Sequence, residues 1–324
     1  MRVLFWGTPD FAVPSLRALV GEGHHVVGVV TQPDRPAGRG RRLRASAVRE
    51  VAIEEGVPVL TPERPRGESF LSALRALDPE ISVVVAYGHI LAPEVLELPR
   101  EGSINVHASL LPELRGAAPV AWAVARGHDR TGVSIMQMTP GMDEGPLLLQ
   151  RETPIGADET ASGLYRRLSE LGAEAVVEAL VLLEAGGIEP QEQDHARATY
   201  APKVGREVAR IDWSRTAREV ANHIRGMDEV PGAWTTLDGE PLKFFRPSVL
   251  AGASEAPPGT VDAMPGTAEA LPGTVLQSDP DIGLVVRAGA GAVAPAEVQP
   301  PGKRRMRVGD WLRGGGPRRG DRFL

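Results

Sequence analysis

The sequence predicts an α/β protein built in two parts, a doubly wound, mostly parallel sheet followed by a small β-barrel or sandwich. Short apolar runs alternate with helical patterns over the first half of the chain, which is typical of a parallel α/β sheet. From residue 199 onward, closely spaced short strands replace this alternation. The length of 324 residues suits two domains of ordinary size. We therefore expect one domain over residues 1–189, a linker over 190–207 and a second domain over 208–324.

The strands of the first domain are continuous Val- and Ile-rich runs, as expected for strands that are covered on both faces. They are expected at residues 3–6, 26–31, 57–60, 81–86, 103–106 and 133–138. Helical patterns lie between them at residues 11–20, 45–55, 70–77, 93–96 and 118–125. A long helix over 160–183 ends before the glycine pair Gly186 and Gly187. Open sheets of this kind bind ligands at the carboxyl ends of their strands.

The second domain shows a short apolar segment at residues 211–213 and a helical pattern at 216–225. Short strands follow at residues 233–237, 241–246, 273–277 and 283–288, separated by Gly/Pro turns. This spacing favours a small barrel or sandwich. Residues 251–272 repeat Pro-Gly-Thr within an Ala/Pro/Gly-rich stretch, which is typical of a loop insertion, and we assign them no function.

The formal net charge of −6 conceals two basic stretches. Residues 35–44 hold five arginines and no acidic residue, and their prolines and glycines exclude a helix. Residues 303–324 hold eight basic residues against two acidic ones. A basic, Gly/Pro-rich loop favours contacts with phosphates. For the C-terminal stretch, a chance cluster on a solvated surface is the simpler interpretation.

Several function classes are excluded by what the sequence lacks. Without cysteine there is no disulfide, no thiolate nucleophile and no Cys-ligated metal, and we expect no metal cofactor. No apolar run reaches the roughly 18 residues of a membrane span, and no signal peptide is evident, so we expect a cytoplasmic protein. Walker A, His-Glu-x-x-His and Gly-x-Ser-x-Gly motifs are missing, and the first strand leads into no Gly-x-Gly-x-x-Gly cradle. These absences argue against hydride transfer with a dinucleotide.

The polar residues most suited to catalysis cluster around one strand. Asn105 and His107 lie two positions apart, so their side chains point to the same face. Asp143 follows the next strand in a Gly-flanked loop that could return to His107. An amide donor beside a protonated imidazole can stabilise a developing oxyanion, and a carboxylate can hold that imidazole in its charged form. The residues alone leave a structural interpretation open, with a turn-capping Asn105, a core His107 and a tight turn at Asp143.

A longer pattern surrounds these residues. Asn105-x-His107-x-Ser109-Leu110-Leu111-Pro112 is followed by Arg115-Gly116 and then by Gly-x-Asp143-x-Gly. Together these motifs resemble the folate-dependent formyltransferases that use 10-formyltetrahydrofolate. Further similar stretches lie at residues 7–11, 31–40, 84–88, 116–119, 132–138, 199–203, 211–214 and 299–303. The resemblance therefore extends over residues 2–214 and continues near the C-terminus.

The resemblance implies a Rossmann-like formyl-transfer domain joined to an OB-like β-barrel, and transfer of a formyl group to the α-amine of methionyl-initiator tRNA. It implies four sets of site residues: Asn105, His107 and Asp143 as the catalytic triad; Ser109, Leu110, Leu111, Pro112, Tyr87, Ile90 and Leu91 in the folate site; Arg39, Arg41 and Arg42 on the tRNA; and Phe11 near the methionyl side chain. The implied co-substrate is 10-formyltetrahydrofolate, with no metal and no membrane partner. We expect a monomer.

Two other functions remain open on the sequence. A formyltransferase acting on an amino-sugar nucleotide or on glycinamide ribonucleotide would share the triad, but such an acceptor does not need an Arg-rich loop. A non-catalytic RNA-binding protein with a similar body would not need a paired Asp143 and His107.

Overall fold

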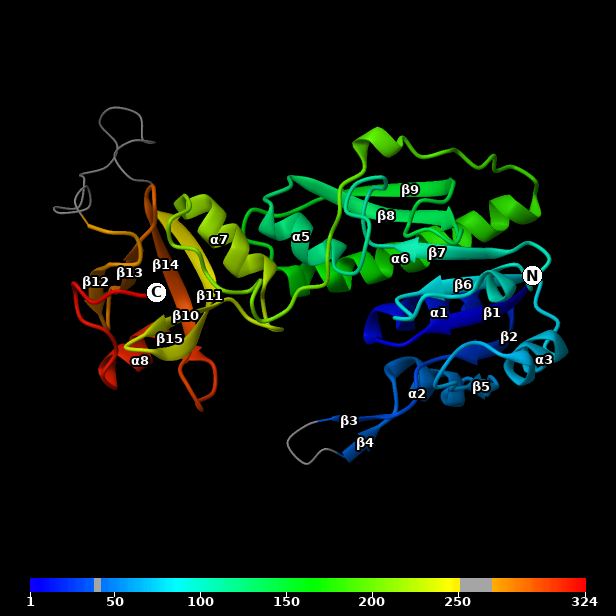
Figure 1. The fold of residues 1–324 in the computed structure, drawn as a ribbon, viewed down its shortest axis with the longest axis horizontal. Helices are drawn as coiled ribbons and strands as arrows, with labels where there is room; N and C mark the ends of the chain where they lie inside the picture. Colours follow the sequence, from blue (N-terminus) through cyan, green and yellow to red (C-terminus); the bar gives the residue numbers. More distant parts are fainter. Residues whose placement is uncertain (38–41, 251–269) are drawn as a thin grey trace. The chain divides into compact units, whose positions relative to one another are not determined.

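The computed structural model describes residues 1–37, 42–250 and 270–324, and the ribbon is drawn in Figure 1. Its contacts divide the chain into two compact units. The first consists of Met1–Pro119, Arg130–Pro154 and Tyr165–Pro202. The second consists of Val120–Asp129, Ile155–Leu164 and Lys203–Leu324. Among the described residues, no helix is both long enough and apolar enough to cross a membrane.

The first unit is built on a seven-stranded sheet with the order β5-β2-β1-β6-β7-β8-β9. Its strands are β1 (Arg2–Gly7), β2 (His25–Val30), β5 (Val59–Leu60), β6 (Ile81–Val85), β7 (Ser103–His107), β8 (Arg130–Gln137) and β9 (Leu147–Pro154). The central strands β1 and β6 are buried along almost their whole length, which explains their uninterrupted apolar sequences. The chain adds strands first on one side of β1, with β2 and β5, and then on the other, with β6 and β7. This is the order of a doubly wound sheet, so the predicted fold class is confirmed.

Two strands of this sheet differ from the sequence prediction. β8 runs antiparallel to β7, and β9, which was not predicted, runs antiparallel to β8. An apolar run carries no information about strand direction, so the sequence could not distinguish a parallel β8 from an antiparallel one. β9 was missed because it is an edge strand with alternating exposure and a polar second half, Gln-Arg-Glu-Thr.

Helices of the first region lie close to their predicted positions. They are η1 (Asp10–Ala12), α1 (Val13–Gly21), α2 (Ala47–Glu54), α3 (Glu68–Ala76), α4 (Pro93–Leu96), α5 (Pro119–Ala125) and α6 (Ala161–Glu184). A further short helix, η2 (His195–Arg197), was not predicted. The predicted helix over 11–20 is divided into η1 and α1, because Pro14 occupies the first turn of α1. α2 begins after Ser46, whose hydroxyl accepts a hydrogen bond from the amide of Arg49.

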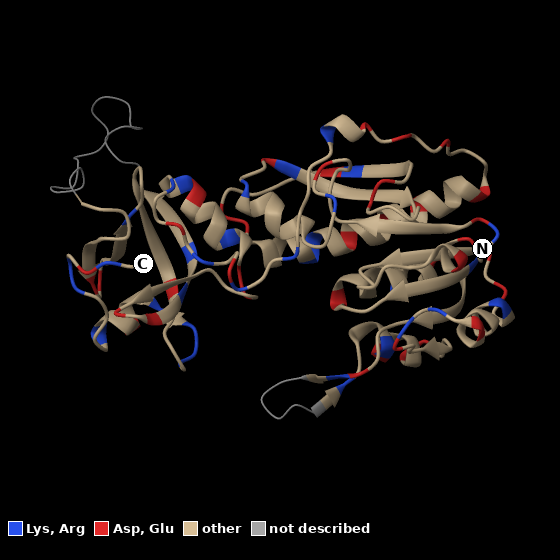
Figure 2. Cartoon of the chain, viewed as in Figure 1, with Lys and Arg blue, Asp and Glu red and all other residues tan. Residues whose placement is uncertain are grey.

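A two-stranded hairpin occupies the basic stretch between β2 and α2. β3 (Arg35–Ala37) pairs antiparallel with β4 (Arg42–Arg44), in agreement with the exclusion of a helix there. At the base of the hairpin, a guanidinium nitrogen of Arg49 lies 2.6 Å from both carboxylate oxygens of Asp34. Basic residues mark both strands of this hairpin in Figure 2.

The second unit contains an antiparallel sheet with the order β10-β11-β14-β13-β12, and β15 pairs with β14. Its elements are α7 (Ala217–Gly226), β10 (Trp234–Leu237), β11 (Glu240–Leu250), β12 (Val275–Asp279), β13 (Gly283–Arg287), β14 (Ala292–Gln299), β15 (Met306–Arg307) and α8 (Val308–Arg313). β14 and α8 were not predicted. An interior proline, Pro295, interrupts the strand pattern of β14, and α8 is only six residues long.

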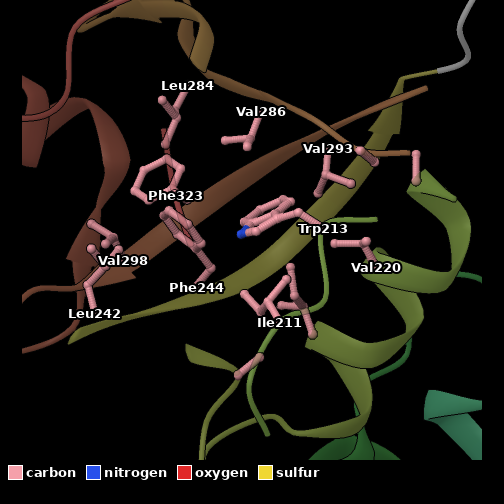
Figure 3. Close-up of a cluster of buried hydrophobic side chains, with 14 of the residues drawn as sticks. Ile211, Trp213, Val220, Leu242, Phe244, Leu284, Val286, Val293, Val298 and Phe323 are labelled. Atoms are coloured by element: carbon pink, nitrogen blue, oxygen red, sulfur yellow. The ribbon is translucent and has the colours of Figure 1, made fainter. Parts of the chain in front are cut away.

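Aromatic side chains pack among aliphatic ones in the core of the second unit (Figure 3). The ring of Phe244 lies edge-on to the rings of Trp213 and Phe323, with centroid distances of 6.2 and 5.2 Å. The indole nitrogen of Trp213 donates a hydrogen bond to the hydroxyl of Thr235, so this buried polar group is satisfied. α7 packs its apolar face on this core and begins with a capping box between Thr216 and Glu219. This antiparallel sheet around one apolar core confirms the predicted β-barrel-type fold of the second part.

Candidate active site

His107 is the last residue of β7, and its imidazole is fixed at one nitrogen. Nε2 lies 3.0 Å from the carbonyl oxygen of Leu114, and the side chain is almost fully buried. A carbonyl can only accept a hydrogen bond, so Nε2 carries a proton in this arrangement. The second nitrogen, Nδ1, therefore determines whether the ring is neutral or charged.

Asp143 faces that second nitrogen. Its Oδ2 atom lies 3.7 Å from Nδ1 of His107 and accepts a hydrogen bond of 2.8 Å from the amide of Gly116. A separation of 3.7 Å is too long for a hydrogen bond, so the contact between the two side chains is electrostatic. Asp143 is thus the acidic group that faces the nitrogen of His107 left free by Leu114.

Asp143 does not reach His107 simply by following a strand that runs parallel to β7. Because β8 is antiparallel to β7, its last residue, Gln137, lies opposite Ile104 rather than beside His107. The loop between β8 and β9 must therefore fold back toward the carboxyl end of β7. Asp143 itself takes a left-handed backbone conformation with φ of 51°, which is uncommon for a residue other than glycine.

Asn105 lies on β7 opposite Met136 and is partly exposed. Along a strand the side chains of residues two apart share a face, so the carboxamide of Asn105 is on the same side of the sheet as His107. Within the described residues this carboxamide makes no hydrogen bond to another protein group. It is a free donor on the face of the sheet that also carries His107.

The segment after β7, which contains Ser109, Leu110, Leu111 and Pro112, is tightly held. The hydroxyl of Ser109 donates to the carbonyl of Glu113 at 2.6 Å, and the peptide bond before Pro112 is cis. The hydroxyl of Ser134 donates to the carbonyl of Ser109 and accepts from the amide of Leu111. With its hydroxyl committed to a carbonyl, Ser109 is not arranged as a nucleophile.

The second segment expected in the folate site contains both buried and exposed side chains. Tyr87 and Leu91 are buried, whereas Ile90 is 88% exposed. Tyr87 packs edge-on against Trp6, its hydroxyl finds no hydrogen-bond partner in the described residues, and burial raises its pKa to about 12. No hydrogen bond or ring contact in the described residues joins this segment to His107 or Asp143.

Phe11 is also buried, with its ring tilted against that of Tyr165 at a centroid distance of 4.9 Å. Of the three expected RNA-binding arginines, Arg39 and Arg41 lie outside the described residues. Arg42 begins β4. The structure therefore brings together His107 and Asp143, with Asn105 on the same strand as His107. No hydrogen bond or ring contact in the described residues joins Phe11 to this pair.

Several residues that support this site were not expected from the sequence. Gln150 of β9 donates to the carbonyl of Leu111, and Gln193 donates to the carbonyl of Asp143. Arg115 belongs to the motif quoted above, and its guanidinium is buried against Gln193. Lone glutamines distant in sequence carry no motif, so no sequence signal could have identified them.

The fold and this site together define a group-transfer enzyme rather than a hydrolase with a serine nucleophile. Residues 1–180 match the family model described as formyl transferase, and residues 203–316 match that of the formyl transferase C-terminal domain. The chain belongs to the formyl transferase family, and it is an enzyme that transfers a formyl group.

Curated relatives refine the family. The chain is 44% identical to the methionyl-tRNA formyltransferase of Citrifermentans bemidjiense, over 97% of this chain and 93% of the relative. It is 45% identical to the methionyl-tRNA formyltransferase of Desulfotalea psychrophila, with the same coverage of each chain. In a solved structure, the N-formyltransferase of Helicobacter canadensis with folinic acid and dTDP-3-aminofucose is similar in fold, at 16% identity and a TM-score of 0.62, over 91% of this chain and 99% of that one.

Proposed function

We propose that this enzyme transfers the formyl group of 10-formyltetrahydrofolate to the α-amine of methionyl-initiator tRNA. The observation that carries the proposal is the pair formed by His107 and Asp143, with one imidazole nitrogen fixed on Leu114 and the other facing the carboxylate. The full-length similarity to methionyl-tRNA formyltransferases supports the choice of acceptor. We assign the reaction to the cytoplasm, where tRNA is charged.

The reaction begins with attack of the neutral amine on the formyl carbon. A carbon–nitrogen bond forms and the formyl oxygen becomes negative. Nε2–H of His107 is committed to Leu114, so Nδ1–H is the group free to face this oxygen, together with the carboxamide of Asn105. Fixed donors aimed at a developing oxyanion lower the barrier, and each is worth about 2.7–4 kcal/mol.

Collapse of the tetrahedral intermediate then breaks the bond between the formyl carbon and N10 of the folate. The attacking nitrogen loses one proton and N10 gains one, so the overall step is balanced. Asp143 is suited to this proton transfer because, among the described residues, only its Oδ2 atom accepts a hydrogen bond, from the amide of Gly116. Direct attack by the amine needs neither a covalent enzyme intermediate nor a metal, in keeping with the committed hydroxyl of Ser109.

The basic hairpin supports an RNA acceptor over a small one. Arg35 and Arg44 are exposed and directly opposite each other in the β3–β4 ladder, and neither has an ion-pair partner in the described residues. Like charges facing each other across two strands are destabilising unless an anion lies near them. Phosphates of an acceptor stem would supply such anions. Arg42, which begins β4, is proposed to bind there as well, together with Arg39 and Arg41, which lie outside the described residues.

We place the folate beside Asn105 and the segment containing Ser109, Leu110, Leu111 and Pro112, with the segment of Tyr87, Ile90 and Leu91 bounding the pterin. The rigidity of the first segment supports this placement, because Ser134 and Gln150 hold its backbone in one conformation. Phe11 is proposed to lie near the methionyl side chain, as part of the apolar wall that it forms with Tyr165.

The test supplies 10-formyltetrahydrofolate with three separate acceptors: methionyl-tRNA, an amino-sugar nucleotide and glycinamide ribonucleotide. Wild-type protein is expected to produce formylmethionyl-tRNA, and His107→Ala to lose this activity. Formylation of a small acceptor in preference to the tRNA, or full activity of His107→Ala, would contradict the proposal.

A further inference from the structure

Gln193 is a buried polar residue in an otherwise exposed segment. Its side chain is 5% exposed, whereas its neighbours Gln191 and Asp194 are exposed. The residue lies between the two segments that match the formyl transferase models, residues 1–180 and 203–316. A buried carboxamide is costly unless its hydrogen-bonding groups are satisfied, so the contacts of Gln193 indicate why it is there.

Both ends of the Gln193 carboxamide are engaged. Its Nε2 atom donates to the carbonyl oxygens of Asp143 and Gly145, at 3.0 and 2.7 Å. Its Oε1 atom accepts from Nε and Nη2 of Arg115, at 3.2 and 2.7 Å. A single side chain therefore joins the loop that carries Asp143 to the segment that follows β7.

These contacts close a ring around Asp143. The side chain of Asp143 is bound by the amide of Gly116, which follows Arg115 directly, and the backbone of Asp143 is bound through Gln193 to Arg115. Leu114, on the other side of Arg115, accepts the hydrogen bond from His107. The same three consecutive residues thus fix His107 directly, and fix Asp143 both directly and through Gln193.

The contacts of Arg115 explain why residue 193 is a glutamine. Arg115 is 3% exposed, and in the described residues its guanidinium contacts Oε1 of Gln193 and Nδ1 of His195. The site needs an acceptor toward Arg115 and two donors toward the loop carbonyls. Among side chains of this length, only a carboxamide supplies both at once.

We infer that Gln193 is a positioning residue that sets the distance between Asp143 and His107. It acts through the backbone of Asp143, whose left-handed conformation would relax without the two hydrogen bonds to the loop. The effect on catalysis rests on the function proposed above, whereas the effect on the position of Asp143 does not.

The most selective test is Gln193→Glu. This change keeps the size of the side chain and an acceptor for Arg115, but it removes both donors to Asp143 and Gly145. Gln191→Glu is the matched control, because it makes the same charge change on an exposed side chain of the same segment. We expect Gln193→Glu to lower kcat by roughly 10- to 100-fold with KM for both substrates unchanged, since small displacements of catalytic groups have effects of this size. Gln191→Glu should match wild type.

A second readout reports the position of Asp143 without any substrate. The amide of Gly116 is protected by its hydrogen bond to Oδ2 of Asp143, so its hydrogen exchange is expected to become faster in Gln193→Glu and to stay unchanged in Gln191→Glu. Unchanged exchange at Gly116 together with wild-type kcat would overturn the inference. If exchange at Gly116 is faster in Gln193→Glu but the wild type forms no formylmethionyl-tRNA, the positioning role stands and the proposed function is refuted.

Gln193→Met covers the case in which the glutamate variant fails to fold. It preserves length without charge and removes every hydrogen bond of the side chain. The same loss of kcat and of Gly116 protection is expected, measured well below a Tm that falls because the buried Arg115 loses its acceptor. A general loss of protection across the first unit, rather than a change at Gly116, would show a purely structural role and contradict the inference.

Discussion

Nδ1 of His107 and Oδ2 of Asp143 lie 3.7 Å apart, within the distance of an ion pair and too far for a hydrogen bond. The imidazole is held in place from its other side, by the carbonyl of Leu114, rather than by the carboxylate. In the proposed mechanism, Nδ1 is therefore the ring nitrogen that faces the negative oxygen of the substrate.

Replacing Asn105 with alanine should lower kcat by about 100- to 1000-fold, because it removes one donor to the developing oxyanion. The KM for each substrate should change little, since the interaction strengthens in the transition state. Steady-state formylation kinetics check this prediction. A rise in KM with unchanged kcat would assign Asn105 to ordinary substrate binding instead.

Arg44→Ala should weaken the interaction with methionyl-tRNA and leave binding of the folate unchanged, because the hairpin is remote from β7 in sequence and carries only phosphate contacts in this account. The dependence of affinity on salt should fall by roughly 0.9 log unit per log unit of salt for the contact that is lost. Arg64→Ala, which removes an exposed arginine elsewhere in the first unit, is the control. Equal losses in both variants would indicate a nonspecific charge effect.

Tyr87 should make stability depend on pH in the alkaline range. Its pKa is raised to about 12 by burial, so the folded state keeps the neutral phenol while the unfolded chain ionises near pH 10. The contribution is complete below pH 10 and is lost as pH rises toward 12, a decrease of about 2 to 3 kcal/mol in the free energy of unfolding.

Urea denaturation of wild type and Tyr87→Phe at several pH values checks this prediction. The difference between the two proteins isolates Tyr87, because other alkaline groups, including the half-buried Tyr165, are common to both. The substitution should also be neutral or stabilising near pH 8, since the hydroxyl of Tyr87 has no partner in the described residues. A pH dependence that is the same in both proteins would contradict the assignment.

The extent to which sequence predicts this molecule varies between elements. β1 and β6 could be placed because strands buried on both faces require unbroken apolar residues. The direction of β8 could not, because side-chain composition is the same for either direction. β9 and β14 were missed because exposure on one face, or a proline in the strand, disrupts the apolar pattern.

The site shows the same division. Asn105, His107 and Asp143 could be proposed because they belong to a compact motif with a recognisable chemistry. The support from Gln193 and Gln150 could not be predicted, since these glutamines reach the site only through long-range folding. The structure was also needed to show that the Ser109 hydroxyl is not arranged as a nucleophile, because it donates a hydrogen bond to the carbonyl of Glu113.

The most direct test of the central claim is the rate of formyl transfer from 10-formyltetrahydrofolate to methionyl-tRNA by wild type and Asp143→Asn. Asparagine keeps the shape of the side chain and can still accept from Gly116, but it removes the negative charge that faces His107. We predict an active wild type and a decrease in kcat of at least about 100-fold in the variant, with KM unchanged. A variant with wild-type kcat would contradict the role of the Asp143–His107 pair in the reaction.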